Sequence, residues 1–419
     1  MIPIALYLTL LFIAPQLWVE PLKGLRADLF LYPVWLLYVI VRGRLLHLFR
    51  WRAQDWFFLG FVLWSATTVI AARVPPKGLD IVFYLAKWFA LYRLTVASTA
   101  GWIGVRRAAN LLVFFGLVLA VEGIQHFWSQ DGLGWAGQTL GWVDEAAGQV
   151  GIDRRTRWIN IFDGPGVFCV AYTIALPFVL QYLGPPYRWF HRIAAIAPIG
   201  ILLLAIYYTG SRGGWITTLV LIGAWVAARR KVSRPKIAAL GVLAILFVIA
   251  GPRYLTSTRD SSKSAQHRVD MWAEGLEMVQ QNPLLGIGRG NFAEYTGRLI
   301  AHNSAVEIMG EAGILGLFLW IGISYTGLKN LLCAIRQTED ERERACAHAL
   351  ALCIAGYLLS AMFVTLEYET LYFLLALAAV AGDELEEPPR FSSRDAVVIL
   401  AIMLAFVVAL KAFVIAYFA

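Results

Sequence analysis

Long apolar runs recur along the whole chain, and short polar segments separate them. Most of these runs approach the roughly 18–20 residues that a helix needs to cross a hydrocarbon core. The runs are continuous, whereas a membrane β-barrel would show short segments that alternate between apolar and polar residues. The pattern therefore predicts an all-α polytopic membrane protein with about 12, and up to 13, transmembrane helices.

The predicted spans cover both halves of the chain. They lie near residues 3–19, 28–41, 55–72, 80–98, 108–127, 165–183, 193–209, 214–228, 237–250, 305–328, 345–366, 369–382 and 395–417. The run at 369–382 is short and also fits a re-entrant segment, which would leave about 12 spans. The first run has neither a basic leader nor a small-residue cleavage site, so we expect a retained span rather than a cleaved signal peptide.

Composition agrees with this class and narrows the partners. Hydrophobic residues make up 59% of the chain and charged residues 15%, whereas a soluble domain has about a quarter charged residues. The net charge of +8 lies mainly in short loops, so it requires no nucleic acid. The four cysteines lie in or beside apolar runs without the spacing of metal ligands. We therefore expect no metal and no other cofactor.

Basic residues mark one side of the predicted membrane. They follow every second span, at 42–52, 106–107, 188–192, 229–236 and 336–344. The positive-inside rule assigns these loops, and the N-terminus, to the cytoplasm. Two long polar loops, 128–164 and 251–303, then lie on the opposite, outer side.

The outer side contains arginines as well, which opposes the same rule. They are Arg154, Arg155 and Arg157 in the first loop, Arg253, Arg259, Arg268, Arg289 and Arg298 in the second, and Arg212 in a short turn between two spans. An anionic ligand would account for them, although long loops also translocate regardless of their charge. For Arg212, in a tight turn at the membrane boundary, the ligand is the favoured explanation.

The polar segment 252–311 is the most distinctive interruption of the apolar pattern. Apolar residues at helical spacing predict a helix over 264–281, and Pro283 ends it. On that helix Arg268 and Trp272 are four residues apart and share a face. Glycines at 286, 288 and 290 predict a turn-rich loop, and a second helix is expected to begin near Asn303.

Three features of this segment are candidates for chemistry. The alternating glycines with Arg289 and Asn291 resemble an anion cradle, in which exposed backbone N–H groups bind a phosphate. His302 is the best candidate for acid–base catalysis, because its ordinary pKa lies near neutral pH, with a structural role as the alternative. Glu311 lies inside an apolar helix, which favours a function, a packing role or a capping role. The helical spacing implies no direct pair between His302 and Glu311.

Four motifs together resemble the O-antigen ligase and polymerase superfamily. They are Thr209-Gly210-Ser211-Arg212-Gly213-Gly214-Trp215; Arg268-Val269-Asp270-Met271-Trp272; Asn282-Pro283-Leu284-Leu285-Gly286-Ile287-Gly288-Arg289-Gly290-Asn291-Phe292; and Ala301-His302-Asn303, followed by Gly310-Glu311-Ala312-Gly313-Ile314-Leu315-Gly316-Leu317. They fall between residues 205 and 320. Each motif is loose, but their order and the surrounding spans make the set fairly specific.

The resemblance implies a fold like that of the C-type glycosyltransferases, in the bacterial inner membrane, with the active site facing the periplasm. Such enzymes take a glycan from undecaprenyl diphosphate. Ligases transfer it to the lipid A–core, and polymerases transfer it to another lipid-linked repeat unit. We therefore expect spans and a periplasmic loop at 128–164 within residues 1–250, a periplasmic helical loop with the active site at 251–304, and C-terminal spans at 305–419.

The resemblance also carries site residues. Arg212 and Arg268 match the arginines thought to bind the donor diphosphate, and His302 matches the essential histidine. Arg289 is a third candidate for the diphosphate. Supporting roles are hypothesised for Trp272, Asn291, Asn303 and Glu311.

These residues suit the expected chemistry. Guanidinium groups can stabilise a leaving diphosphate without a metal, and an imidazole can accept the proton of the attacking hydroxyl. Attack opposite the leaving group predicts inversion at the anomeric carbon.

Other functions stay open at this level. The sequence does not name the acceptor, so an O-antigen or exopolysaccharide polymerase is the first alternative to a ligase. A transporter or flippase for a lipid-linked solute would favour charges at the membrane midplane and inverted repeats. Lys87 and Arg93 are the main such charges, and no repeat is evident. A non-catalytic scaffold is the third alternative.

Overall fold

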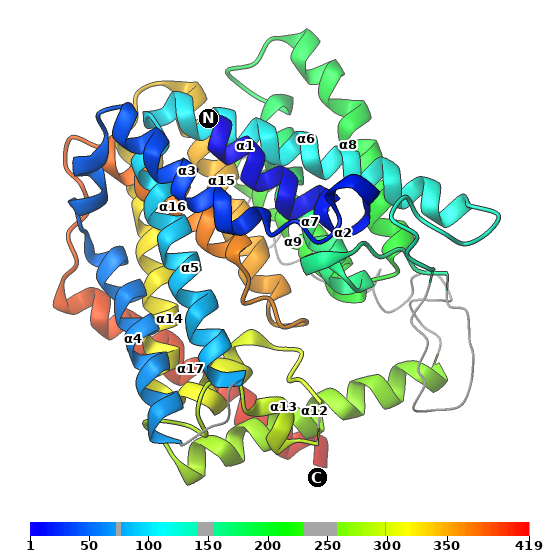
Figure 1. Ribbon diagram of the computed structural model, residues 1–419, viewed down its shortest axis with the longest axis vertical. Coiled ribbons are helices and arrows are strands. Elements are labelled where there is room, and N and C mark those ends of the chain that lie inside the picture. The colour runs from blue at the N-terminus through cyan, green and yellow to red at the C-terminus, as the bar shows by residue number, and fades with distance from the viewer. Residues whose placement is uncertain (73–76, 141–153, 230–257, 298, 419) are drawn as a thin grey trace. The chain divides into compact units, whose positions relative to one another are not determined.

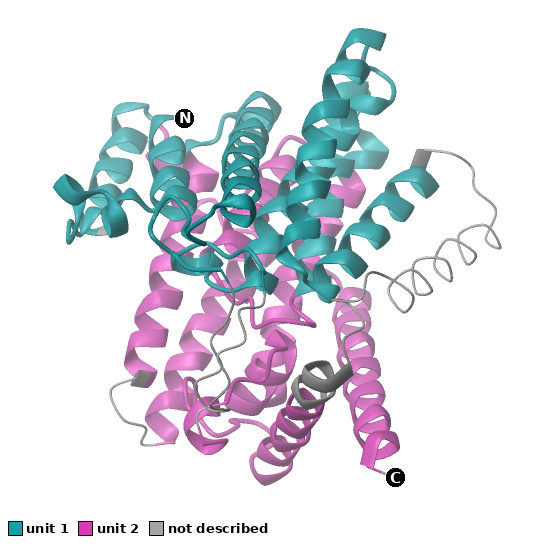
Figure 2. Cartoon of the chain, turned by 90° about the vertical axis from the view of Figure 1, so that its right-hand side faces the viewer, with its two compact units in different colours: residues 1–43, 98–256, 334–360 teal, residues 44–97, 257–333, 361–419 magenta. Residues whose placement is uncertain are grey.

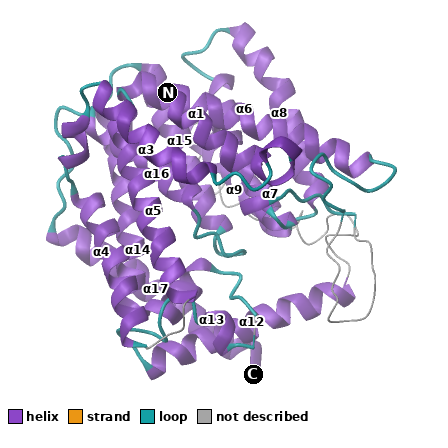
Figure 3. Ribbon diagram, in the orientation of Figure 1, coloured by secondary structure: helices purple, strands orange, loops and turns teal. Residues whose placement is uncertain are grey.

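The computed structural model describes residues 1–72, 77–140, 154–229, 258–297 and 299–418. Throughout these ranges the chain forms helices joined by loops and turns, and no strand occurs in them (Figure 3). The all-α prediction is confirmed. The chain forms two compact units, and each is built from segments far apart in the sequence (Figure 2).

The first unit comprises residues 1–43, 98–256 and 334–360. Its helices are α1 (Ile2–Leu8), α2 (Pro15–Trp18), α3 (Ala27–Val41), α6 (Gly101–Trp128), α7 (Pro165–Leu180), α8 (Trp189–Thr209), α9 (Arg212–Arg229) and α15 (Glu341–Ser360), with short helical turns η1 (Thr9–Ile13), η2 (Glu20–Leu22), η5 (Asn160–Phe162) and η6 (Gln181–Leu183) (Figure 1).

Helix α7 is the core of this unit. All its residues from Val167 to Leu180 are buried, and it packs against α6, α8, α9 and α15. Small residues allow close approach between these helices. Gly116 of α6 faces Ala175 of α7, where an added Cβ would lie 2.7 Å from the alanine Cβ. Such small-residue contacts are typical of helix pairs in membranes, because lipid supplies no hydrophobic force between helices.

The second unit comprises residues 44–97, 257–333 and 361–419. Its helices are α4 (Ala53–Ala71), α5 (Lys77–Ser98), α12 (Thr258–Gln281), α13 (Phe292–Tyr295), α14 (Ser304–Gln337), α16 (Glu369–Asp383) and α17 (Ser393–Phe418), preceded by η3 (Leu45–Phe49). Phe58 of α4 stacks on Tyr372 of α16, with ring centroids 4.3 Å apart. The Gln54 side chain donates to the Leu375 carbonyl at 3.0 Å, which ties α4 to α16 a second time.

Arg93, one of the two expected midplane charges, has a structural role in this unit. Its guanidinium is buried, pairs with Asp55, and donates to the carbonyls of His47 and Leu48 at 2.8 Å. These contacts fasten the η3 segment to α4 and α5. The charge is therefore matched within the protein, which removes one feature that favoured a transporter.

Six helices in the described part are long and apolar enough to cross a membrane: Gly78–Ser98, Gly101–Trp128, Pro165–Leu183, Trp189–Thr209, Ser304–Gln337 and Ser393–Phe418. Ile2–Ile13, Leu29–Val41 and Arg212–Ala228 are shorter apolar helices. These nine agree with a polytopic membrane protein. The predicted span at 237–250 lies outside the described residues, and the total of about 12 stays a prediction.

Two of the predicted spans are not continuous helices over their predicted ranges. The first, at 3–19, is interrupted at Ala14, which has a left-handed φ of 51°. Pro15 follows, and a proline disfavours helical backbone at the residue before it. The span predicted at 345–366 ends as a helix at Ser360. The next residues form a loop because their backbone groups bond to the start of α14, as described below.

Candidate functional site

The turn at 301–303 joins the polar segment to α14. Asn303 caps this helix, since its Oδ1 accepts the N–H groups of Ala305 and Val306 at 3.0 and 3.2 Å. His302, immediately before the cap, has a φ of 49°. This left-handed conformation is uncommon for a residue with a Cβ and is found often at functional sites. The predicted supporting role of Asn303 thus corresponds to a helix cap beside the histidine.

His302 is half-buried, and its Nδ1 is enclosed with no hydrogen-bond partner in the described ranges. Burial, with the positive charge of nearby Arg268 as the smaller cause, lowers the pKa of His302 to about 4. The imidazole is therefore neutral at neutral pH, which is the form that can accept a proton.

Trp272 connects the helix that carries Arg268 to this turn. Its indole N–H donates to the Ala301 carbonyl at 3.0 Å. Its ring also lies 5.7 Å from the ring of Phe413 on α17, measured between centroids. The structure thus brings Arg268, Trp272 and His302 together. Arg268 and Trp272 share the predicted helix face, so the bond from Trp272 to the turn also brings Arg268 near His302.

The glycine loop docks on α14 through several of its own backbone N–H groups. Its N–H groups at Ile287 and Gly288 donate to the carbonyls of Gly310 and Glu311 at 3.0 and 2.9 Å. The Phe292 N–H donates to the Glu311 carboxylate at 2.9 Å. The N–H groups of Ile287 and Gly288 are thus used within the protein, which weighs against a phosphate cradle at 286–291, and the cradle stays a prediction.

A break in α14 makes this docking possible. Gly313, with φ 68° and ψ −172°, interrupts the helix, so the carbonyls before it are available to the glycine loop. The Ile314 N–H then bonds to the Pro283 carbonyl at 2.8 Å, and Trp64 of α4 donates to Ala312 at 2.8 Å. Asn291 closes the loop on itself by donating to the Ile287 carbonyl at 2.8 Å.

Arg289 is the buried centre of this arrangement. It donates to Glu311 at 2.6 Å and pairs with Glu367, while its guanidinium lies 5.8 Å from the Phe61 ring centroid. Burial alone would lower the pKa of Arg289, but these two carboxylates outweigh it and raise that pKa. The diphosphate role predicted for Arg289 stays a prediction, and its two acidic partners weigh against it.

Sequence reasoning missed the segment at 361–368. Besides Glu367, this segment supplies the Ala361 carbonyl to the Ser304 N–H at 2.8 Å and the Leu366 N–H to the Ser304 hydroxyl at 2.7 Å. The Thr365 hydroxyl donates to Glu307 at 2.8 Å. In the sequence, a carboxylate between two apolar runs was the feature that could have indicated this segment. These bonds fix the start of α14, and so the position of His302.

Arg212 lies in the first unit, where it begins α9. Ser211 caps this helix by accepting the Gly214 N–H at 3.1 Å. The side chain of Arg155 packs on Gly210, where an added Cβ would lie 3.2 Å from the arginine Cγ. The neighbouring Thr156 N–H donates to the Tyr208 carbonyl at 3.1 Å. The structure therefore places a second arginine, Arg155, beside the turn of Arg212. From the sequence, Arg155 was only one of several arginines in an outer loop.

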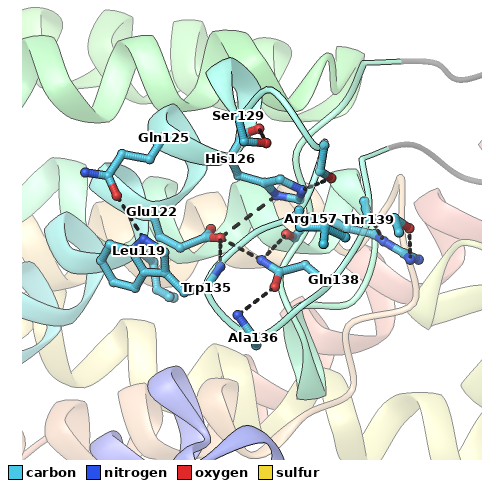
Figure 4. A network of polar contacts seen from close by, with 12 residues as sticks. Leu119, Glu122, Gln125, His126, Ser129, Trp135, Ala136, Gln138, Thr139 and Arg157 are labelled. Carbon is cyan, nitrogen blue, oxygen red and sulfur yellow. Dashed lines mark hydrogen bonds and ion pairs between the residues drawn. The ribbon is translucent and has the colours of Figure 1, made fainter.

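A network of polar contacts joins the end of α6 to two loop segments (Figure 4). The buried Glu122 carboxylate on α6 accepts the Gln138 amide at 2.6 Å and the Trp135 N–H at 3.4 Å. Gln138 also donates to the Arg157 carbonyl at 3.4 Å, and Arg157 donates to the Thr139 carbonyl at 3.1 Å. Residues 133–139 and the segment around Arg157 are thereby held at the end of α6.

No cluster of three or more potential metal-ligating side chains occurs in the described residues. What the fold and the site define is a multi-pass helical membrane protein with a neutral histidine and arginines in the polar segments between its spans.

Residues 197–321 match the family described as O-antigen ligase. This range contains Arg212, Arg268, Arg289, His302 and Glu311. An O-antigen ligase of Pseudomonas aeruginosa is 28% identical over 146 residues, which cover 32% of this chain and 35% of that relative. The match thus spans about a third of the relative's length. The resemblance predicted from the motifs is confirmed over residues 197–321, the range that matches the O-antigen ligase family.

Proposed function

We propose that this protein is an O-antigen ligase that transfers a glycan from undecaprenyl diphosphate to a hydroxyl of the lipid A–core. The observation that carries the proposal is the neutral His302 in a strained turn beside Arg268, within the range that matches the ligase family. A general base next to an anion-binding group suits transfer from a sugar diphosphate.

In the proposed reaction the acceptor oxygen attacks the anomeric carbon and the bond from that carbon to the diphosphate oxygen breaks. The acceptor proton passes to His302, and Arg268 stabilises the negative charge on the departing diphosphate. The diphosphate role that the resemblance gives to Arg212 stays a prediction. Attack opposite the leaving group inverts the anomeric centre. No step requires a metal, because the guanidinium groups carry the charge that a metal would otherwise supply.

Donor binding would also strengthen the base. In the unliganded protein the charge of Arg268 contributes to the low pKa of His302. A bound diphosphate would offset that charge, so protonation of the imidazole would become more favourable when the donor is present. The base would thus reach useful strength in the complex that needs it.

The remaining predicted residues support the site in this proposal. Trp272 holds the turn of His302, Asn303 caps α14, and Asn291 shapes the glycine loop. Arg289 and Glu311 lock that loop to the break in α14. We propose a positioning role for both, and the diphosphate role predicted for Arg289 is the alternative.

We further propose the expected location and division of the chain. The protein would lie in the bacterial inner membrane with membrane lipids around residues 1–250 and 305–419. The loop at 128–164 and the segment 251–304 would face the periplasm, where the donor glycan is presented.

Deletion in the native host followed by lipopolysaccharide gel analysis tests the acceptor. A ligase predicts loss of all long chains while lipid-linked polymer accumulates, and plasmid-borne wild-type protein should restore the chains. A core that carries a single repeat unit would instead identify a polymerase. An unchanged lipopolysaccharide profile would contradict both.

A further inference from the structure

A cavity of about 320 Å³ in the first unit lies between α6, the η6 turn with the loop after it, and α15. Its wall on α6 includes Arg106, Arg107 and Asn110, which follow helical spacing and so share one face. Tyr182, Tyr187 and Arg342 supply other parts of the lining. Its volume lies within the roughly 300–1,000 Å³ of typical ligand sites.

Three guanidinium groups face this cavity without direct partners. Across the ranges that the structure describes, no side-chain hydrogen bond or ion pair involves Arg106, Arg107 or Arg342. Asp340 acts on two of them electrostatically, but its Oδ1 accepts the backbone N–H groups of Arg342 and Glu343 at 2.7 and 3.0 Å. The lining therefore has an excess of positive charge that an anion would balance.

The surroundings indicate where that anion comes from. Arg106, Arg107 and Arg342 belong to the basic loops that the positive-inside pattern assigns to the cytoplasm. Helix α8 contacts η6, and its first turns expose Trp189 by 70% and Ile193 by 59%. Exposed aromatic and apolar side chains beside a basic pocket are typical of the membrane–water interface.

We infer that this cavity binds the phosphate headgroup of an anionic phospholipid from the cytoplasmic leaflet. The planar guanidinium fork matches phosphate oxygens, and basic pockets between membrane helices on this side recognise such headgroups. The acyl chains would lie along the exposed apolar residues of α8. Free phosphate shares the headgroup chemistry but gains nothing from that apolar surface. This site is independent of the proposed glycan transfer.

Native mass spectrometry of the full-length protein in detergent tests the inference. Phosphatidylglycerol, phosphatidylcholine and glycerol 1-phosphate are titrated separately. We expect phosphatidylglycerol to bind in preference to the other two. The R106Q/R342Q variant should bind it on the order of tenfold more weakly, since two charge-assisted contacts are lost.

The control is R50Q/R336Q, which removes two exposed arginines from the same predicted side, neither of them in the cavity. It should bind phosphatidylglycerol like the wild type. R106K/R342K keeps both charges and should fall between the two, because lysine lacks the bidentate fork. Equal affinities of R106Q/R342Q and the control would overturn the site. Glycerol 1-phosphate that binds as tightly as the lipid would overturn the lipid as its source. Should R106Q/R342Q fail to fold, wild-type affinity in the lysine variant would overturn the guanidinium contacts.

Discussion

At the scale of single residues, His302 combines a proposed chemical role with an unfavourable backbone conformation. Its left-handed φ of 49° costs a residue with a Cβ about 1 kcal/mol or more. We expect His302→Ala and His302→Gly both to abolish glycan transfer. The glycine variant should be more stable than the alanine variant by about 1 kcal/mol, because glycine adopts this φ freely.

Thermal unfolding in detergent and a complementation assay measure the two effects separately. Restored long-chain lipopolysaccharide with His302→Ala would exclude this histidine as the base. Equal stability of the two variants would instead show that the turn relaxes and that the strain is absent.

Arg268 offers a second test at this scale, through the pKa of His302. The imidazole accepts a proton only when neutral, so its reactivity falls as pH falls through its pKa. Removing the positive charge in Arg268→Gln should raise that pKa from about 4. It should stay below 6.5, the ordinary value, because burial is the larger cause and persists.

Modification by diethyl pyrocarbonate, which reacts with neutral imidazole, reports this pKa when followed at His302 by peptide mass spectrometry. The midpoint of the modification rate should move to higher pH in the variant. A midpoint that does not move would show that Arg268 exerts no charge effect on the histidine.

Local spacing explains which of these residues could be predicted. Arg268 and Trp272 are one helical turn apart, and His302 lies at the end of a polar segment, so the sequence alone draws attention to them. The partners of Arg289 could not be predicted in this way, because Glu311 and Glu367 lie 22 and 78 residues further along the chain. Only the tertiary fold shows that its charge is already matched.

At the scale of elements, the site depends on the fit between the glycine loop and the broken helix α14. Sequence spacing predicts the loop correctly but not its function, since the helix break that takes up its N–H groups depends on Gly313. Gly286 is one point of close approach between the loop and α14. It has a φ of 64°, and an added Cβ would collide with the carbonyls of Gly310 and Glu311.

Gly286→Ala should therefore lower the free energy of unfolding by on the order of 3 kcal/mol, from the unfavourable φ and the collision together. Gly297→Ala is the matched control. Its φ is 72°, but nothing lies within 4 Å of an added Cβ, so only about 1 kcal/mol should be lost. Chemical unfolding in mixed micelles measures both, and equal losses would mean that the loop is not clamped to α14.

At the scale of the whole molecule, apolar runs predict the helical class and most helices, because spanning a membrane constrains composition strongly. The apolar runs give wrong helix boundaries where other contacts or a proline interrupt the helix, as at Ala14 before Pro15 and in the loop after Ser360. The predicted sidedness of the chain rests on loop charge alone, and it decides whether the proposed transferase site can meet a periplasmic donor.

Single cysteines introduced into a cysteine-free background test this sidedness. Asp131 and Glu339 are both exposed, and they lie in loops predicted to face opposite sides. In intact cells a charged maleimide that crosses only the outer membrane should label Asp131→Cys. Glu339→Cys should react only after the inner membrane is permeabilised. The reverse pattern would put the segment with His302 in the cytoplasm, away from the donor, and would place the arginine-lined cavity on the periplasmic side. Labelling of both sites in intact cells would contradict the span order between residues 131 and 339.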